Sequence, residues 1–245
     1  MTLSELLVPS CALFLDFDGT LVDIAPQPDA VIVPAGLVSA LEALHGRLGG
    51  ALALISGRPI AQIDAFLQPM RLPTAGVHGA ERRSASGDIT LVATYPLDRV
   101  QAVALALAAR DPRLRLEVKR GSIALHFRQA PELEPLCRET MEAAVRESPG
   151  VTLLAGKMVF EAKPSGASKG HAIEAFMREA PFAGRRPLFV GDDITDEVGF
   201  ATVQRMQGLG VKVGEGATVA WERIASPALF RQQLQAASAA RKVDR

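Results

Sequence analysis

The sequence predicts an α/β fold: a doubly wound parallel sheet with a smaller α+β unit inserted into it. Three short, continuous apolar runs, at residues 11–15, 51–55 and 187–190, are typical of strands that are buried on both faces of a parallel sheet. The segments after the first two runs carry apolar residues at helical spacing, whereas the middle of the chain alternates apolar and polar residues. We therefore expect a parallel core that is discontinuous in sequence, and a separate antiparallel sheet in the insert.

The first half of the predicted core is a βαβ unit followed by a further helix. Between the runs at 11–15 and 51–55, leucines recur at helical spacing, which predicts a helix that ends at Gly49-Gly50. These leucines are Leu37, Leu41, Leu44 and Leu48. The second run leads through the residues SGRP into another helical pattern, with Pro59 in its first turn. This order of elements is typical of a doubly wound α/β domain.

The insert is expected to follow the order αββαββ. Its predicted elements are a helix at 97–109, strands at 114–119 and 122–128, a helix at 132–147, and strands at 151–155 and 157–162. In the stretch SIALHFR, one face collects Ile123, Leu125 and Phe127 and the other is mostly polar, which predicts an antiparallel sheet with one buried face. The predicted domains are residues 1–95 and 164–245 for the core, and residues 96–163 for an inserted α+β cap domain.

Composition argues against several classes of partner. The chain has 27 basic and 27 acidic residues without long basic clusters, so we expect no nucleic-acid partner. No apolar stretch approaches the roughly 18 residues of a membrane span, and the N-terminus has no basic region ahead of an apolar one, so we expect neither a membrane anchor nor export. Cys11 and Cys137 lack the spacing of a zinc site or of a disulfide framework, which favours the cytoplasm.

Asp16 and Asp18 follow the first apolar run directly, in the stretch LFLDFDGTLVD. In open α/β sheets, ligands bind beyond the carboxyl ends of the strands, and an extended chain would project both side chains to the same side. Asp18-Gly19 between apolar residues is also a strong signal for a β-hairpin turn. On this stretch alone, a turn and a reaction centre are equally good interpretations.

A second acidic group follows the apolar run at 187–190. In the stretch LFVGDDITDE, Asp192 and Asp193 come directly after the strand, and Asp196 lies about one helical turn later. Two strands of one sheet would then bring carboxylates to one place, and such a set of oxygen ligands favours Mg²⁺ shared with a substrate phosphate. We expect Asp192 to bind the metal, and helix capping is an alternative for Asp193 and Asp196.

Donors for a phosphate occur at two predicted helix starts. Ser56 and Gly57 end the second apolar run, where a hydroxyl and free backbone N–H groups form an anion site. In the stretch KPSGASKG, Lys169 opens a helix and can meet a phosphate there, whereas Lys163 comes earlier. The alternatives are a simple N-cap for Ser56 and a solvated surface charge for either lysine.

Four short motifs resemble those of the haloacid dehalogenase-like superfamily of phosphoryl-transfer enzymes, in the same order along the chain. They are DFDGT, ISGR, a lysine before glycine, and GDDxTD. The insert between the second and third motifs corresponds to the larger type of cap in that superfamily. The stretches GVHGAERR, ALHFRQAP, FEAKPSGASKG and GDDITDEVGF are similar to the trehalose-6-phosphate phosphatase family.

The resemblance implies roles for the aspartates that follow the strands. Asp16 would be the nucleophile that forms an aspartyl-phosphate. Asp18 would act as the general acid and then as the general base. Mg²⁺ would bind Asp16, the backbone carbonyl of Asp18 and Asp192, and would offset the repulsion between the nucleophile and the phosphate.

The remaining motif residues would support this chemistry. Ser56 and Lys169 would bind the transferring oxygens. Lys169 rather than Lys163 is chosen for the third motif because it precedes a glycine at a helix start. Asp193 and Asp196 would orient the metal's waters or Lys169.

Residues expected to bind the substrate lie near the second motif and on the cap strands. Glu161 and Lys163 alternate to one face of a cap strand, as His126 and Arg128 do on another, and such a face can hydrogen-bond sugar hydroxyls. A merely solvated face is an equal alternative for His126 and Arg128, and a packed position at the core edge is one for His78. The full set of candidates is Gly57, Arg58, His78, Glu81, Arg82, His126, Arg128, Glu161 and Lys163.

The resemblance implies a phosphatase that converts trehalose 6-phosphate to trehalose, with a functional pairing to a trehalose-6-phosphate synthase left open. A broader sugar-phosphate or sucrose-phosphate phosphatase shares every core motif and is the first alternative. A receiver-like signalling domain also gathers aspartates, a hydroxyl and a lysine around Mg²⁺, but it has no use for Asp18 or for a large cap. A phosphomutase and a catalytically silent domain are the remaining candidates, and the oligomeric state is not predicted.

Overall fold

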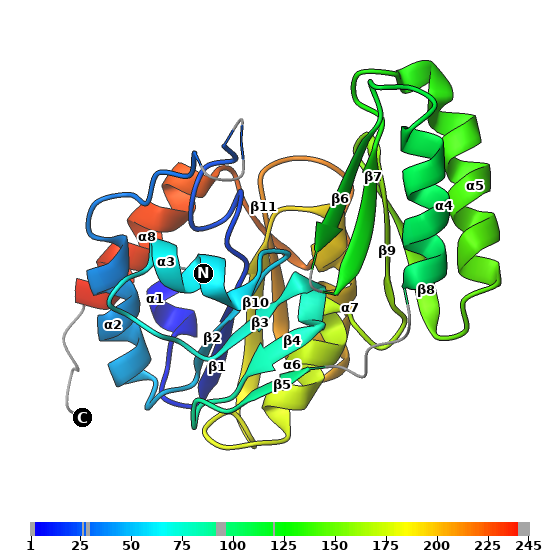
Figure 1. Cartoon of the computed structure of the whole chain (residues 1–245). Coiled ribbons are helices and arrows are strands. Elements are labelled where there is room, and N and C mark those ends of the chain that lie inside the picture. The colour runs from blue at the N-terminus through cyan, green and yellow to red at the C-terminus, as the bar shows by residue number, and fades with distance from the viewer. Residues whose placement is uncertain (1–2, 26, 28–29, 92–96, 120, 240–245) are drawn as a thin grey trace. The chain divides into compact units, whose positions relative to one another are not determined.

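The computed structural model describes residues 3–25, 27, 30–91, 97–119 and 121–239 (Figure 1). The chain divides into two compact units, Met1–Thr90 with Ser168–Arg245 and Leu91–Ala167. The predicted boundary between residues 95 and 96 lies outside the described residues, and the core and cap domains with those bounds stay a prediction.

The first unit is built on a mainly parallel sheet, which confirms the predicted fold class. Its strand order is β12-β11-β10-β1-β2-β3-β4-β5. The strands are β1 (Cys11–Leu15), β2 (Leu52–Ile55), β3 (Thr74–Gly76), β4 (Glu81–Arg83), β5 (Ile89–Leu91), β10 (Arg186–Gly191), β11 (Leu209–Val213) and β12 (Glu222–Ile224). The pairs from β12 through β3 are parallel, and β4 pairs antiparallel with β3.

Helices cover both faces of the central strands, which is why β1 and β2 are apolar and buried throughout. Figure 1 shows α2 and α8 on one face of the sheet and α6 and α7 on the other. The helices of this unit are α1 (Leu3–Leu6), α2 (Leu37–Arg47), α3 (Ile60–Phe66), α6 (Lys169–Met177), α7 (Glu197–Arg205) and α8 (Pro227–Ala239), with single turns η1 (Val77–Gly79) and η3 (Ile194–Asp196). The core between sheet and helices includes Phe14, Phe176 and Phe182, whose ring centroids lie 5.1 to 6.0 Å apart.

The second unit contains a separate antiparallel sheet with two helices on one face. Its elements are α4 (Asp98–Ala108), β6 (Arg115–Lys119), β7 (Ser122–His126), the turn η2 (Pro131–Leu133), α5 (Glu134–Arg146), β8 (Val151–Gly156) and β9 (Val159–Pro164). The strand order is β6-β7-β9-β8. Ile123, Leu125 and Phe160 face the helices in a second apolar core, and the alternation of the strands leaves Ser122 and Glu161 on the opposite face.

The three apolar runs predicted as strands are confirmed as β1, β2 and β10, with ends that shift by at most one residue. Four further strands of the first sheet, β3, β4, β5 and β12, have three residues each, which is too short for a periodic pattern to predict them. The predicted strand at 122–128 ends at His126, so Arg128 lies beyond it in a turn. None of the helices in the described part of the chain has the length and hydropathy of a membrane-spanning helix.

Candidate active site

Three neighbouring strands of the parallel sheet end at one edge and place polar side chains there. Asp16 follows β1, Asp192 follows β10 and Ser56 follows β2, with β1 in the middle. The N–H of Asp16 still donates to the carbonyl of Val190 at 2.9 Å, which fixes its main chain beside β10. The carboxyl edge of the sheet is where ligands bind in this type of fold.

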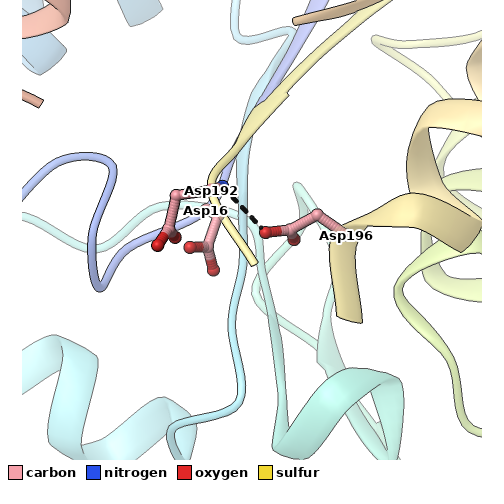
Figure 2. A group of neighbouring side chains, drawn as sticks. All are labelled: Asp16, Asp192 and Asp196. Atoms are coloured by element: carbon pink, nitrogen blue, oxygen red, sulfur yellow. Dashed lines mark hydrogen bonds between the residues drawn. The ribbon is translucent and has the colours of Figure 1, made fainter. Parts of the chain in front are cut away.

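Asp16, Asp192 and Asp196 form an acidic cluster at this edge (Figure 2). One carboxylate oxygen from each residue lies within 4.8 Å of the other two. Asp16 is only 4% exposed and Asp196 is fully buried, at 0%. The hydroxyl of Thr20 lies 3.4 Å from both Asp16 Oδ2 and Asp192 Oδ1. Because carboxylates gathered in a buried place repel one another, the cluster needs positive charge.

Lys169 supplies part of that charge. It is the first residue of α6, whose start is fixed by Ser168, since the Ser168 hydroxyl accepts from the N–H of His171 at 3.1 Å. Lys169 Nζ donates to Asp16 Oδ1 at 2.7 Å and to Asp196 Oδ1 at 2.6 Å, and the residue is 3% exposed. Lys169, which the sequence favoured for the third motif, therefore contacts Asp16 directly.

The pKa values of these groups reflect their burial and their mutual charges. Burial raises the pKa of Asp16 well above its usual range, Lys169 opposes this rise, and Asp196 and Asp192 add to it. Burial, followed by the charge of Asp196, raises the pKa of Asp192 to about 6. Burial alone would lower the pKa of Lys169, but the charges of Asp16 and Asp196 outweigh burial and raise it. The lysine is therefore a stable cation, while the aspartates still lack compensating charge.

The donor set of the cluster fits a divalent cation. Both oxygens of Asp196 are already engaged: Oδ1 accepts from Lys169, and Oδ2 accepts from the N–H groups of Asp192 and Asp193 at 3.0 and 2.9 Å. Asp16 and Asp192 thus remain as oxygen ligands, the donor type that Mg²⁺, Ca²⁺ and Mn²⁺ prefer. Asp193 and Asp196 also form a capping box around η3, so the capping alternative for these two residues is present in the structure.

The Asp-Gly pair after β1 forms a turn that borders the cluster. Gly19 has a φ of 77°, its N–H donates to the carbonyl of Val22 at 2.8 Å, and Asp18 and Val22 form an isolated bridge. A Cβ atom on Gly19 would lie 2.1 Å from Asp192 Oδ2, so only glycine allows this approach. The bridge is parallel, so this turn is not the β-hairpin that the sequence offered as the alternative to a reaction centre.

Asp18 forms a bidentate ion pair with Arg58. Arg58 Nε donates to Asp18 Oδ2 at 2.6 Å, and Arg58 Nη2 donates to Asp18 Oδ1 at 2.8 Å. The same guanidinium lies over the ring of Phe66, 5.2 Å from its centroid. Ser56 Oγ accepts from the N–H of Arg58 at 3.1 Å, a local contact of the kind that the capping alternative for Ser56 implies. Arg58, predicted to bind substrate, thus contacts the predicted acid.

The other substrate candidates of the first unit have partners within that unit. Gly57 lies against the ring of His78, because a Cβ on Gly57 would meet the His78 Cε1 and Nε2 atoms at 2.7 Å. Glu81 is buried and accepts from the N–H of Ile60 at the start of α3. Arg82 pairs with Glu179 and lies over the ring of Phe176. Glu81 and Arg82 therefore have structural contacts that the sequence did not reveal.

In the second unit, two of the four candidates are buried on the polar side of the sheet. Glu161 and Lys163 are each 7% exposed, and the hydroxyl of Ser122 donates to Glu161 Oε1. His126 Nε2 lies 3.0 Å from Glu117 Oε2. Arg128 is exposed in the turn after β7, so the alternation that grouped it with His126 does not extend to it.

Two residues that contact the cluster were not predicted. Thr20 bridges Asp16 and Asp192, and the signal for it was a hydroxyl inside the DFDGT motif. Lys212, on β11, is 5% exposed and donates to the main-chain carbonyl of Asp192. The signal for Lys212 was a single charge inside the otherwise apolar strand LGVKV.

Comparison with solved structures identifies the fold. The C-terminal domain of C. albicans trehalose-6-phosphate phosphatase matches with a TM-score of 0.83, at 20% identity, over 97% of this chain and 98% of that chain. A haloacid dehalogenase-like hydrolase from B. subtilis matches with a TM-score of 0.63, at 16% identity, over 91% of this chain and 99% of that chain. The fold is that of the haloacid dehalogenase-like hydrolases.

Sequence comparison then identifies the family. The family model described as Trehalose-phosphatase matches residues 14–230. The trehalose-6-phosphate phosphatase of Escherichia coli (strain K12) is 47% identical over 217 residues, which cover 87% of this chain and 81% of the relative. The chain therefore belongs to the trehalose-phosphatase family. Phosphatases of this class generally use a divalent metal, and the acidic cluster could hold one.

Proposed function

We propose that this chain hydrolyses trehalose 6-phosphate to trehalose and inorganic phosphate, in trehalose biosynthesis. The observation that carries the proposal is the buried contact between Lys169 and Asp16 at the carboxyl end of β1, beside Asp192. It supports the proposal because a carboxylate, an ammonium and a second carboxylate lie together at the sheet edge where ligands bind in this fold. The substrate follows from the relatives that carry this activity in their names.

Asp16 is the proposed nucleophile. Lys169 holds its Oδ1 at 2.7 Å, whereas Oδ2 has a longer contact of 3.4 Å with the Thr20 hydroxyl and is the proposed attacking oxygen. The attack forms the Asp16–phosphorus bond and breaks the bond between phosphorus and the sugar oxygen, which leaves with a proton from Asp18. For this step Asp18 must be protonated and released from its ion pair with Arg58. Water then attacks the aspartyl-phosphate and gives its proton to Asp18, which frees phosphate and restores both carboxyl groups. Ser56 and Lys169 bind the transferring oxygens, because a hydroxyl and a fixed ammonium stabilise the added negative charge.

Mg²⁺ is the proposed cofactor, held by Asp16, Asp192 and the backbone carbonyl of Asp18. When bound, it supplies positive charge that offsets the repulsion between the carboxylate and the phosphate. Asp196 orients Lys169 through the hydrogen bond from Nζ to Oδ1. Asp193 helps to hold Asp196 in place, because the two residues form the capping box at η3.

The second unit is the proposed cap that binds the sugar. Glu161 and Lys163 are the main candidates there, because both are buried. A substrate analogue that lacks the matching hydroxyl would leave such buried polar groups unpaired and would therefore bind much more weakly. His126 and Arg128 are more exposed and are secondary candidates. In the first unit, Gly57, Arg58 and His78 are candidates for the phosphate side of the substrate. Glu81 and Arg82 stay candidates for a substrate contact beside the structural contacts that they make.

We place the reaction in the cytoplasm, because Cys11 and Cys137 are buried free thiols, and we keep a functional pairing with a trehalose-6-phosphate synthase as part of the proposal. The test is phosphate release from a panel that contains trehalose 6-phosphate, sucrose 6-phosphate and glucose 6-phosphate, with MgCl₂ or with EDTA. We expect phosphate release to be much faster from trehalose 6-phosphate than from the other two substrates. We expect EDTA to abolish phosphate release. Equal rates on all three substrates would replace the proposed substrate by a broader sugar-phosphate activity.

A further inference from the structure

Asp192 lies just beyond the end of β10, where the main-chain ladder of the sheet stops. The register between β10 and β11 ends with the pair Gly191 and Lys212. Both main-chain polar groups of Asp192 are held by side chains instead: its N–H donates to Asp196 Oδ2 at 3.0 Å, and its carbonyl accepts from Lys212 Nζ. A carboxylate and an ammonium therefore fix the backbone on either side of one residue.

Lys212 is an unusual residue for its position. All five residues of β11 are buried, and Lys212 itself is 5% exposed. Across the described ranges, no carboxylate forms an ion pair with Lys212, and its ammonium donates to the carbonyls of Asp192 and Val213, the latter at 3.1 Å. Burying an ammonium is costly compared with burying an apolar side chain of similar size. The contact with the carbonyl of Asp192 is what an apolar residue could not provide.

We propose that Lys212 is a positioning residue for the cation site. Its ammonium holds the main chain of Asp192, so that the Asp192 carboxylate is directed toward Asp16 before a cation binds. The inference rests on the proposed function in one respect, because that function makes Asp16 and Asp192 the carboxylate ligands of the cation. Partners that hold metal ligands in this way typically change metal affinity by about 10- to 100-fold.

The charge of Lys212 and its positioning role predict opposite effects on cation binding. An ammonium repels a divalent cation, so removal of the charge alone would tighten cation binding. Loss of the contact with Asp192 would free the metal ligand and weaken cation binding. The direction of the change in affinity therefore separates the two roles.

The test is Mn²⁺ binding to the full chain without substrate, measured by the electron paramagnetic resonance signal of free Mn²⁺. We expect Lys212→Met to weaken binding by about 10- to 100-fold. Lys212→Gln is neutral but keeps an N–H donor, so its affinity should lie between those of Lys212→Met and the wild type. Val211→Ala is the matched control: it removes buried apolar volume from the same strand, so it should lower the melting temperature and leave Mn²⁺ affinity unchanged.

Unchanged or tighter Mn²⁺ binding in Lys212→Met would overturn the proposal. If Lys212→Met does not fold, Lys212→Gln decides in the same way, since weaker binding supports the positioning role and unchanged or tighter binding overturns it. The readout is separate from catalysis. A wild-type chain that binds Mn²⁺ but releases no phosphate from trehalose 6-phosphate would refute the proposed function, and the effect of Lys212→Met on Mn²⁺ affinity would still test the positioning role.

Discussion

Gly19 and Asp192 approach each other so closely that a single added carbon atom would collide: a Cβ on Gly19 would lie 2.1 Å from Asp192 Oδ2. The two residues follow different strands, β1 and β10, which are neighbours in the sheet. Gly19 also has a φ of 77°, a conformation that side chains disfavour. This glycine is therefore required for the turn and for the position of the Asp192 carboxylate.

Substitution of Gly19 by alanine should disable the site beyond its effect on the backbone. We expect Gly19→Ala to lower phosphate release by about 100-fold, because a displaced carboxylate no longer matches the reacting groups. The matched control is Gly184→Ala, since Gly184 has a φ of 75° and a Cβ added there would have no atom within 4 Å. Each variant should lose about 1 to 2 kcal/mol of unfolding free energy from the left-handed conformation alone.

The comparison needs both urea unfolding and phosphate release for the two glycine variants. Gly184→Ala should keep the wild-type rate despite its lower stability. Equal activity of Gly19→Ala and Gly184→Ala would show that the Asp192 carboxylate has room to move, against our account.

Removal of Lys169 should cost both stability and activity. Lys169→Met leaves Asp16 and Asp196 buried without their shared partner, so we expect a loss of about 3 to 5 kcal/mol in the unfolding free energy when no divalent cation is present. Added MgCl₂ should restore part of this loss, because a cation replaces some of the missing charge. Lys157→Met is the control, since Lys157 is exposed and should change neither quantity. Wild-type stability of Lys169→Met in EDTA would argue against this role.

Arg83 should matter for stability and not for the reaction. Its guanidinium contacts both oxygens of Asp64 at 2.7 Å and also donates to the carbonyl of Leu72, while its neighbour Arg82 pairs elsewhere. We expect Arg83→Met to lower the unfolding free energy by on the order of 3 kcal/mol, because Asp64 loses a bidentate partner, while the Leu72 carbonyl keeps the hydrogen bond from the Thr74 hydroxyl. The rate per folded molecule should stay at the wild-type level. A fall in that rate without a fall in stability would assign Arg83 to the site.

Cation binding should strengthen as the pH rises. Burial and the charge of Asp196 raise the pKa of Asp192 to about 6, from 3.8 in the unfolded reference. Because the folded state keeps this proton to higher pH, the group stabilises the cation-free protein at low pH, and this stabilisation is lost as the pH rises through about 6. We therefore expect MgCl₂ to raise the melting temperature more at about pH 7.5 than at about pH 5. Equal increases at both values would contradict a proton-linked cation site.

The residues at the sheet edge could be predicted because each follows a continuous apolar run. Asp16, Ser56 and Asp192 need only the rule that parallel strands end together, and Lys169 needs only a helix start. The ion pair between Asp18 and Arg58 could not be predicted, because it joins residues 40 positions apart in the loops after β1 and β2. Such contacts follow from three-dimensional packing and leave no periodic signal.

Two further differences have simple physical reasons. Alternation was extended to Arg128, but β7 ends at His126, and beyond a strand the alternation of faces no longer holds. Lys212 was not predicted because pattern analysis assigns no partner to a single charge in an apolar strand. Its partner is a main-chain carbonyl, which every residue carries and which no sequence motif marks.

The most direct test of the central claim is to identify the residue that carries the phosphoryl group during turnover. Turnover of trehalose 6-phosphate with MgCl₂ would be quenched in acid, reduced with borohydride, which converts an aspartyl-phosphate to homoserine, and analysed by peptide mass spectrometry. Asp18→Asn is run beside the wild type, because Asp18 is the proposed acid for formation of the intermediate as well as the base for its breakdown. We predict homoserine at position 16 only when substrate is present. Homoserine at another aspartate, or none at position 16 in either protein while the wild type releases phosphate, would contradict the assignment of Asp16 as the nucleophile.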